Sequence, residues 1–249
     1  MKNTLISVIV PTFNERGNIL LLIEQIHKEL SDFTHEIVVV DDNSPDGTYQ
    51  LVCEQKHSFV KPLLRTENPG LAYSIRFGLE HAAGDIFVVM DSDFNHQPKY
   101  IPQMIKNLEF YDAVSGSRFL YGGAMDSRAR HILSWAFNIF VRIVTGKYIT
   151  DSLYGFFAIH RSVMAKLDYD KIFWGYGDYC IRLMYYLQEF NTPILQIPVV
   201  NGRRLRGQAN ARFLRTFCQY TTETFKLFLR ERMKLNQRKP GEDTCRLKR

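Results

Sequence analysis

The sequence predicts an α/β domain with a mostly parallel central sheet flanked by helices. Two observations predict it. Short runs rich in β-branched residues alternate with longer segments of helical periodicity, and acidic or polar residues follow directly after several of the short runs. Such alternation is typical of βαβ units, in which helices cover both faces of the sheet.

Each expected element follows from its residues. In the first half of the chain, β-branched runs predict the strands, and apolar residues spaced three or four apart predict the helices between them. The strands are expected at 5–10, 36–40, 62–65, 86–90 and 113–116, and the helices at 18–30, 48–56, 72–83 and 99–110.

The second half is less regular. Its pattern predicts helices at 128–145, 177–189 and 211–235, and strands at 155–160 and 194–200. Proline, glycine and many charges make residues 236–249 a basic tail that is expected to be disordered. We therefore expect one domain at 1–210, a C-terminal helix at 211–235 and this tail.

The composition is that of a globular protein, with 45% hydrophobic and 23% charged residues among 249. The four cysteines have no paired short spacing, so neither a zinc site nor a disulfide framework is indicated. No stretch approaches the roughly 18 apolar residues of a membrane span, and the apolar run at 5–10 is too short for a secretory signal. A cytoplasmic protein is therefore expected.

The net charge of +6 is unevenly distributed. Residues 201–249 carry 14 Lys and Arg against 4 Asp and Glu, whereas the remaining 200 residues have a net charge of −4. A basic C-terminal fifth indicates an anionic partner, which could be a phosphate-bearing substrate, a membrane surface or nucleic acid. Nucleic acid is the least favoured of these, because no nucleic-acid-binding motif accompanies the basic residues.

Acidic residues follow two of the predicted strands, at the edge of the sheet where ligands bind. Asp91 and Asp93 come directly after the strand at 86–90, and in an extended segment this spacing points both carboxylates to one side. Such a pair suits Mg²⁺ or Mn²⁺, which completes its coordination with water and phosphate oxygens. A helix cap needs only one acid, so we favour the metal site over capping.

A second acidic pair, Asp41 and Asp42, follows the strand at 36–40. The next residues, NSPDG, are typical of a turn, but two adjacent acids exceed what a turn requires. One of them can accept hydrogen bonds from a base or a ribose. Neither GxGxxG nor a P-loop pattern is present, so a metal and basic side chains would neutralise phosphate charge.

Five segments together resemble a known family: VIVPTFNE, IVVVDDNSPDGT, GDIFVVMDSDFNHQP, SGSRF and DSLYGFFAIHR. They are similar to family 2 glycosyltransferases of the GT-A fold, and most similar to dolichol-phosphate or polyprenol-phosphate mannose synthases, over about residues 1–210. The resemblance implies a GT-A catalytic domain at 1–210 that binds a nucleotide sugar. It further implies inverting transfer of a sugar, mannose from GDP-mannose, to a polyprenyl phosphate with Mg²⁺ or Mn²⁺.

The resemblance also implies roles for individual residues. Those expected to contact the nucleotide sugar are Pro11, Phe13, Glu15, Asp41, Asp42, Asp91 and Arg204. Those expected to hold the metal are Asp91, Asp93 and, where the family usually has Gln, Asn95. Those expected to receive the acceptor phosphate are Arg118, Arg130 and Ser134. Asp91, Asp93 and Arg118 are thus candidate catalytic residues.

The sequence departs from the family at two places. DSLYGFF places the bulky Tyr154 where the family has a small residue, near the expected sugar pocket. The family's G-x-S-K reads GQAN here, so that Ala209 and Asn210 replace a serine and a lysine. Losing a cation near the phosphates leaves both the donor and the acceptor open.

Asp178 supports a second interpretation. An acid in this region serves as general base in relatives that glycosylate hydroxyl groups, so with Asp178 as catalytic base the acceptor would be a glycan hydroxyl and the donor another nucleotide sugar. Otherwise Asp178 is a helix N-terminal acid. A third interpretation is a non-catalytic subunit that binds a nucleotide sugar.

Two helices suggest a membrane surface as a partner. The first carries Trp135, Phe137, Phe140 and Val144, and the basic terminal helix carries Phe213, Phe217, Phe225, Leu227 and Phe228. Either these stripes are packed in the core, or they attach the chain peripherally to the cytoplasmic face of a membrane. A membrane subunit or a homo-oligomer is a further possible partner.

Overall fold

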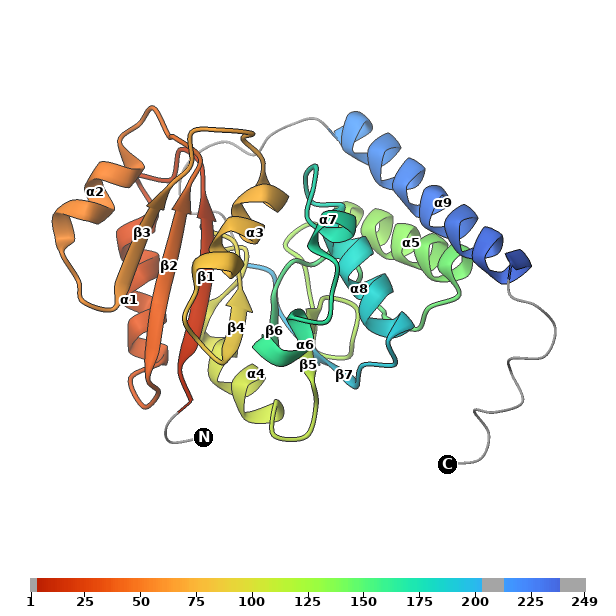
Figure 1. Cartoon of the computed structure of the whole chain (residues 1–249), viewed down its shortest axis with the longest axis horizontal. Helices are drawn as coiled ribbons and strands as arrows, with labels where there is room; N and C mark the ends of the chain where they lie inside the picture. Colours follow the sequence, from red (N-terminus) through yellow and green to blue (C-terminus); the bar gives the residue numbers. More distant parts are fainter. Residues whose placement is uncertain (1–3, 203–212, 238–249) are drawn as a thin grey trace.

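The computed structural model describes residues 4–202 and 213–237. In this part of the chain a seven-stranded sheet has the order β3-β2-β1-β4-β6-β5-β7 (Figure 1). The strands are β1 (Ile6–Thr12), β2 (His35–Asp41), β3 (Val60–Leu64), β4 (Ile86–Val89), β5 (Ala113–Ser117), β6 (Phe157–His160) and β7 (Ile194–Pro198).

The pairing confirms the mostly parallel sheet. β1 is parallel to β2 and β4, β2 to β3, and β5 to β7. β6 is antiparallel to both β4 and β5, between which it lies. The sheet therefore has a parallel part, β3-β2-β1-β4, and a second parallel pair, β5-β7, and the reversed strand β6 joins the two.

The helices occupy the predicted segments, with two short additions. Their bounds are α1 (Ile19–Glu29), α2 (Thr48–Gln55), α3 (Leu71–His81), the 3₁₀ turn η1 (Pro98–Tyr100), α4 (Ile101–Asn107), α5 (Arg128–Thr145), α6 (Arg161–Met164), α7 (Tyr169–Ile172), α8 (Tyr179–Glu189) and α9 (Phe213–Gln237). The four-residue helices α6 and α7 were not predicted, because a single turn shows no periodicity. Residues 238–249, most of the tail expected to be disordered, lie outside the described residues.

The sheet has a hydrophobic core on each face, because successive side chains of a strand point to opposite sides. Val8 and Val10 of β1 belong to one core, with residues of α1 and α4. Ile9 belongs to the other, with residues of α3 and α8. Helices on both faces hold the strands rigidly, so the residues at their carboxyl ends are well positioned.

α5, α8 and α9 form a third, smaller cluster beside the sheet. Phe137 and Val141 of α5 pack with Ile181 and Tyr185 of α8 and with Leu227 of α9. Figure 1 shows α5 and α9 lying side by side at the end of the molecule away from β3. The C-terminal helix is therefore packed on the domain through this cluster.

Candidate active site

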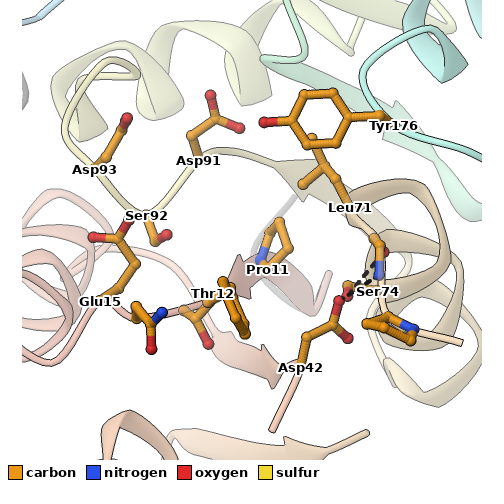
Figure 2. A pocket seen from close by; sticks show the side chains of 14 residues that line it. Pro11, Thr12, Glu15, Asp42, Leu71, Ser74, Asp91, Ser92, Asp93 and Tyr176 are labelled. Atoms are coloured by element: carbon orange, nitrogen blue, oxygen red, sulfur yellow. Dashed lines mark hydrogen bonds between the residues drawn. The ribbon is translucent and has the colours of Figure 1, made fainter. Parts of the chain in front are cut away.

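A cavity of about 600 Å³ opens at the carboxyl ends of β1, β2 and β4. This is the edge at which parallel sheets bind ligands. Figure 2 shows the carboxylates of Asp42, Asp91 and Asp93 around the cavity. Of the residues predicted to bind the donor or the metal, those that line it are Pro11, Phe13, Glu15, Asp42, Asp91 and Asp93.

Asp42 is fixed by the loop that precedes α3. Its Oδ1 accepts a hydrogen bond from Arg65 Nη1 at 2.5 Å, and its Oδ2 accepts one from the backbone N–H of Gly70 at 2.7 Å. Arg65 Nη2 donates to the carbonyl oxygens of Glu67 and Asn68. The Arg65–Asp42 ion pair therefore shapes the wall of the cavity that Gly70 helps to form.

Asp41, predicted to contact the nucleotide, is held inside the turn after β2. Its carboxylate is fully buried and accepts hydrogen bonds from the Thr12 hydroxyl and from the backbone N–H and hydroxyl of Ser44. It does not line the cavity. Asp41 therefore closes the turn after β2, and Asp42 alone of this pair faces the site.

His96 supports Asp91 from behind the cavity. Its Nδ1 accepts the backbone N–H of Asp91 at 2.8 Å, and its Nε2 lies 3.5 Å from Asp91 Oδ2. The ring stacks on Phe156 with 5.1 Å between centroids. Burial lowers the pKa of His96 to about 3, so the imidazole is neutral and can accept at one nitrogen while it donates at the other.

Asn95 braces the turn that carries Asp93. Its backbone N–H and its Nδ2 donate to the two carboxylate oxygens of Asp93, at 3.0 and 2.7 Å. Its carbonyl oxygen accepts the Tyr154 hydroxyl at 3.0 Å and the Gly202 N–H at 2.8 Å. Asn95 does not line the cavity, so the predicted metal ligand is observed as a support for Asp93.

The donors at the cavity suit a hard divalent cation. Asp91 and Asp93 both line it, and the Asp91 side chain is 38% exposed. Within 4–202 and 213–237, no group of three or more His, Cys, Asp and Glu side chains is arranged to hold a metal. Two carboxylates fit Mg²⁺ or Mn²⁺, which often takes one or two of them and keeps water and phosphate oxygens as its other ligands.

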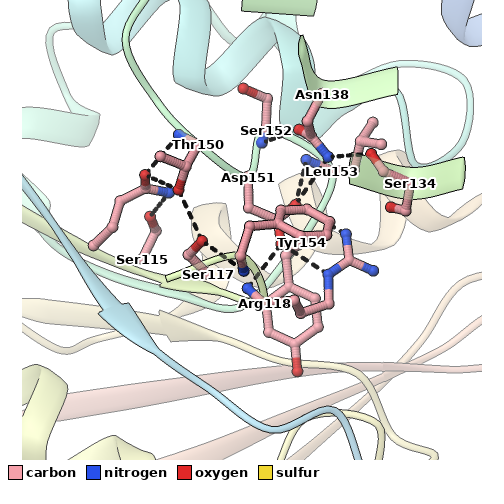
Figure 3. A network of polar contacts seen from close by, with 12 residues as sticks. Ser115, Ser117, Arg118, Ser134, Asn138, Thr150, Asp151, Ser152, Leu153 and Tyr154 are labelled. Carbon is pink, nitrogen blue, oxygen red and sulfur yellow. Dashed lines mark hydrogen bonds and ion pairs between the residues drawn. The ribbon is translucent and has the colours of Figure 1, made fainter. Parts of the chain in front are cut away.

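Arg118, predicted to bind the acceptor phosphate, lies in a buried ion pair. Its Nε and Nη2 donate to the two oxygens of Asp151 at 2.7 and 2.9 Å (Figure 3). Burial opposes the charge of the guanidinium, but Asp151 outweighs that effect and raises the pKa of Arg118. The guanidinium also packs against the Tyr154 ring, 4.8 Å from its centroid.

The other two predicted acceptor residues lie on α5. Asn138 Nδ2 donates to the carbonyl oxygen of Ser134 at 2.9 Å and lies 3.5 Å from Asp151 Oδ1. Ser134 thus joins the network of Arg118 (Figure 3), and Arg130 is exposed one turn earlier on the helix. None of these three predicted residues lines the cavity, so they form a separate group.

Comparison with known proteins identifies the family. The family model described as glycosyl transferase family 2 matches residues 7–168. The chain is 32% identical over 228 residues to dolichol-phosphate mannosyltransferase of Pyrococcus furiosus, across 89% of this chain and 63% of that protein. The chain belongs to glycosyl transferase family 2.

Two further relatives of this glycosyltransferase have names that include a polyprenol or a polyprenyl phosphate. Undecaprenyl-phosphate mannosyltransferase of Micrococcus luteus is 31% identical, across 81% of this chain and 85% of that protein. Polyprenol monophosphomannose synthase of Mycolicibacterium smegmatis is 28% identical, across 80% of this chain and 78% of that protein. The chain spans just under two thirds of the length of the Pyrococcus relative.

A solved structure confirms the GT-A fold of the glycosyltransferase. Glucosyl-3-phosphoglycerate synthase from Mycobacterium tuberculosis, in complex with Mn²⁺, uridine diphosphate and glucosyl-3-phosphoglycerate, superposes with a TM-score of 0.68. The match covers 89% of this chain and 78% of that chain at 21% identity. The same enzyme has been crystallised with Mg²⁺ and uridine diphosphate, with a TM-score of 0.64.

Asp178, the candidate general base, lies in a buried ion pair next to the N-terminus of α8. The side chain is fully buried, and its Oδ2 accepts Arg182 Nη1 at 2.5 Å. Its Oδ1 accepts the Tyr176 N–H and Gln219 Nε2. Asp178 does not line the cavity, so its part as a general base stays a prediction, and its observed contacts are structural.

Several residues at the site were missed from the sequence. Arg65, Gly70 and Tyr176 shape the cavity, and His96 supports Asp91. The turn-forming NPG before α3 was the available signal for Gly70, whereas no local pattern marked Tyr176. Arg204, Ala209 and Asn210 lie outside the described residues.

Proposed function

We propose that this family 2 glycosyltransferase transfers a hexose, mannose from GDP-mannose, to a polyprenyl phosphate with inversion at the anomeric carbon. The observation that carries the proposal is the cavity at the ends of β1, β2 and β4, where Asp42, Asp91 and Asp93 gather. The named activities of the relatives from Pyrococcus and Micrococcus support the choice of donor sugar and acceptor.

In this proposal the donor lies in the cavity. Pro11, Phe13 and Glu15 contact its nucleoside, and Asp42, held by Arg65, accepts hydrogen bonds from the base or ribose. Asp91 and Asp93 would hold the metal, which when bound would supply positive charge near the diphosphate of the donor. Arg204 remains a proposed contact for the donor phosphates.

The acceptor phosphate is assigned to Arg118, with Arg130 and Ser134. Asp151 holds two nitrogens of the Arg118 guanidinium, so a phosphate would be met by Nη1. A phosphate acceptor is already ionised at neutral pH and needs no strong base. This removes the need for a general base, and Asp178 is not placed to be one.

A lipid acceptor requires access to a membrane surface, and α5 and α9 offer it. The exposed apolar side chains of α5 are Ile132, Leu133, Trp135 and Ile143, and those of α9 are Phe225, Leu229 and Met233. Exposed Arg130, Arg142 and Arg230 accompany them. No helix in the described residues is long and apolar enough to cross a membrane. We therefore propose peripheral attachment to an anionic leaflet through these faces.

The test is transfer of labelled sugar from GDP-mannose, UDP-glucose and other nucleotide sugars to a polyprenyl phosphate or to free sugars, with and without Mn²⁺. We expect transfer from GDP-mannose to the lipid phosphate and none to sugars. Turnover of sugars but not of the lipid would favour the glycan-extending alternative. Replacing Asp91 by Ala should abolish turnover, and full turnover in that variant would contradict the metal site.

The same assays on the parent chain also test the third interpretation. If the parent chain binds nucleotide sugars but turns none over with any acceptor, the chain is a non-catalytic binding subunit. Two carboxylates facing the cavity favour the enzyme, because a protein that only binds the donor has little need of the metal.

A further inference from the structure

A buried charged cluster joins α9 to the donor side of the domain. Asp178, the residue before α8, and Arg182 of α8 are 0% and 1% exposed, and Glu223 of α9 is 5% exposed. Arg182 Nη1 lies 2.5 Å from Asp178 Oδ2 and 3.6 Å from Glu223 Oε2. Gln219 of α9 donates from Nε2 to Asp178 Oδ1 at 3.1 Å. Gln219 thus holds Asp178 from α9, and Glu223, which also pairs with Lys226 of its own helix at 2.7 Å, places its second carboxylate oxygen near Arg182.

The same ion pair holds the segment that leads into α8. Arg182 Nε donates to the carbonyl oxygen of Ile172 at 2.8 Å, and Nη2 donates to that of Trp174. The guanidinium lies over the Trp174 ring, 3.8 Å from its centroid. Asp178 Oδ1 accepts the backbone N–H of Tyr176 at 2.9 Å. The backbone from 172 to 176 is therefore fixed by this pair.

Tyr176 connects the buried ion pair to the cavity. Its side chain is one of those that line the cavity, and its hydroxyl points toward Asp91 across the opening (Figure 2). The oxygen that accepts its backbone N–H, Asp178 Oδ1, is the oxygen that also accepts Gln219. A change at Gln219 in α9 therefore reaches a wall of the cavity through one shared atom.

We propose that α9 positions the donor-binding wall: Gln219 and Glu223 hold the buried Asp178–Arg182 pair, and that pair holds Tyr176 over the cavity. Gln219 and Glu223 are positioning residues, because they act on Tyr176 through Asp178 and Arg182 and do not line the cavity. The inference rests on the proposed function in taking the cavity as the donor site. Buried charges are costly unless they are paired and hydrogen-bonded, so loss of a partner from α9 shifts the pair and the segment it holds.

The test compares Gln219→Ala and Glu223→Gln with Thr222→Ala in the full chain. Thr222 is the control, because it is exposed on α9 and its hydroxyl donates to the Cys218 carbonyl oxygen of its own helix. The chain has two tryptophans, Trp135 and Trp174. All variants and their parent carry Trp135→Phe, so that Trp174 is the only tryptophan that emits. Titration with GDP, UDP and dTDP in Mn²⁺ gives the dissociation constants, and Trp174 emission reports the segment.

We expect Gln219→Ala to weaken nucleotide binding about fivefold, the effect of losing one hydrogen bond. Glu223→Gln should weaken it as well, and both should shift Trp174 emission, whereas Thr222→Ala should change neither. Unchanged dissociation constants in a folded Gln219→Ala variant would overturn the inference, whatever the emission does. If the parent binds none of the three nucleotides, the proposed function is contradicted. If the parent binds and Gln219→Ala binds equally well, only the positioning role of α9 is contradicted.

Discussion

At the scale of the residue, Tyr154 connects the two halves of the site. Its ring lies against the Arg118 guanidinium, and it makes an edge contact with His96, 4.4 Å between centroids. Its hydroxyl donates to the Asn95 carbonyl oxygen, in the turn that carries Asp93. The bulky residue that departs from the family pattern is thus a buried brace between Arg118 and the turn after β4.

Replacing Tyr154 by Phe should lower the free energy of unfolding by about 1 kcal/mol. The ring contacts stay, but the buried hydrogen bond to Asn95 is lost, and bonds of this kind are worth about 0.5–1.5 kcal/mol. Urea unfolding followed by circular dichroism measures the change. The matched control is Tyr148→Phe, at a tyrosine that is 59% exposed and should be nearly neutral. Equal effects in both variants would contradict the bracing role.

The sequence predicted which residues gather at the site better than it predicted their roles. Asp91 and Asp93 were predicted because a buried strand leads to them. Asp41 and Asp42 could not be told apart, since their orientations depend on how β2 ends against Thr12 and Ser44. The pairing of Asp178 with the arginine four residues later was visible as helical spacing, but its burial came from α9 packing over it.

At the scale of the element, α5 has two apolar faces with different environments. Phe137 and Val141 pack on α8 and α9, whereas Trp135 and Ile143 are 50% and 76% exposed. The sequence left open whether the stripe of Trp135, Phe137, Phe140 and Val144 was core or membrane interface. Phe137 is packed in the core and Trp135 is exposed, and attachment to a membrane stays a prediction. The predicted bounds 128–145 agree with α5, because a serine cap precedes the helix and a left-handed glycine ends it.

Replacing Ile143 by Glu should weaken binding to anionic vesicles roughly tenfold, because burying such a side chain is worth about 1.5–3 kcal/mol and a carboxylate is repelled by anionic lipid. Sedimentation with vesicles of phosphatidylserine and phosphatidylcholine measures the partition. Phe110→Glu, at a phenylalanine that is 79% exposed outside α5 and α9, is the control and should bind as the parent does. Equal losses in both variants would show that α5 is not the docking face.

At the scale of the whole molecule, the order and direction of the strands could not be predicted from local sequence pattern. Periodicity gave the strands their places along the chain, but nothing in FAIH indicates that β6 runs antiparallel between β4 and β5. That reversal brings Asp151 and Tyr154 beside Arg118 and so builds the buried group around that arginine. Tertiary packing also decides which thiols are shielded: Cys180 of α8 is buried in the core against the sheet, and Cys218 is exposed on α9.

Burial of Cys180 predicts alkaline instability. Burial raises the pKa of its thiol from 9.0 to about 12. Between these values the unfolded chain loses the proton while the folded chain keeps it, so the stabilisation is complete below pH 9 and is lost as the pH rises toward 12. We expect the free energy of unfolding to fall by about 2 kcal/mol between pH 9 and pH 10.5 through this thiol. Burial also raises the pKa of Tyr169, from 10.0 to about 12. The loss of stability through Tyr169 therefore begins near pH 10, one pH unit above that through Cys180.

Urea unfolding at pH 8 and pH 10.5 measures the loss in the parent, in Cys180→Ala and in Cys218→Ala. Cys180→Ala should be less stable at pH 8, because a buried side chain is shortened, but should lose less stability between the two pH values than the parent. Cys218→Ala should keep the parent's pH dependence, because an exposed thiol meets similar solvent in both states. An equal pH dependence in all three chains would mean that Cys180 ionises alike in the folded and unfolded states, which would contradict its burial in the core.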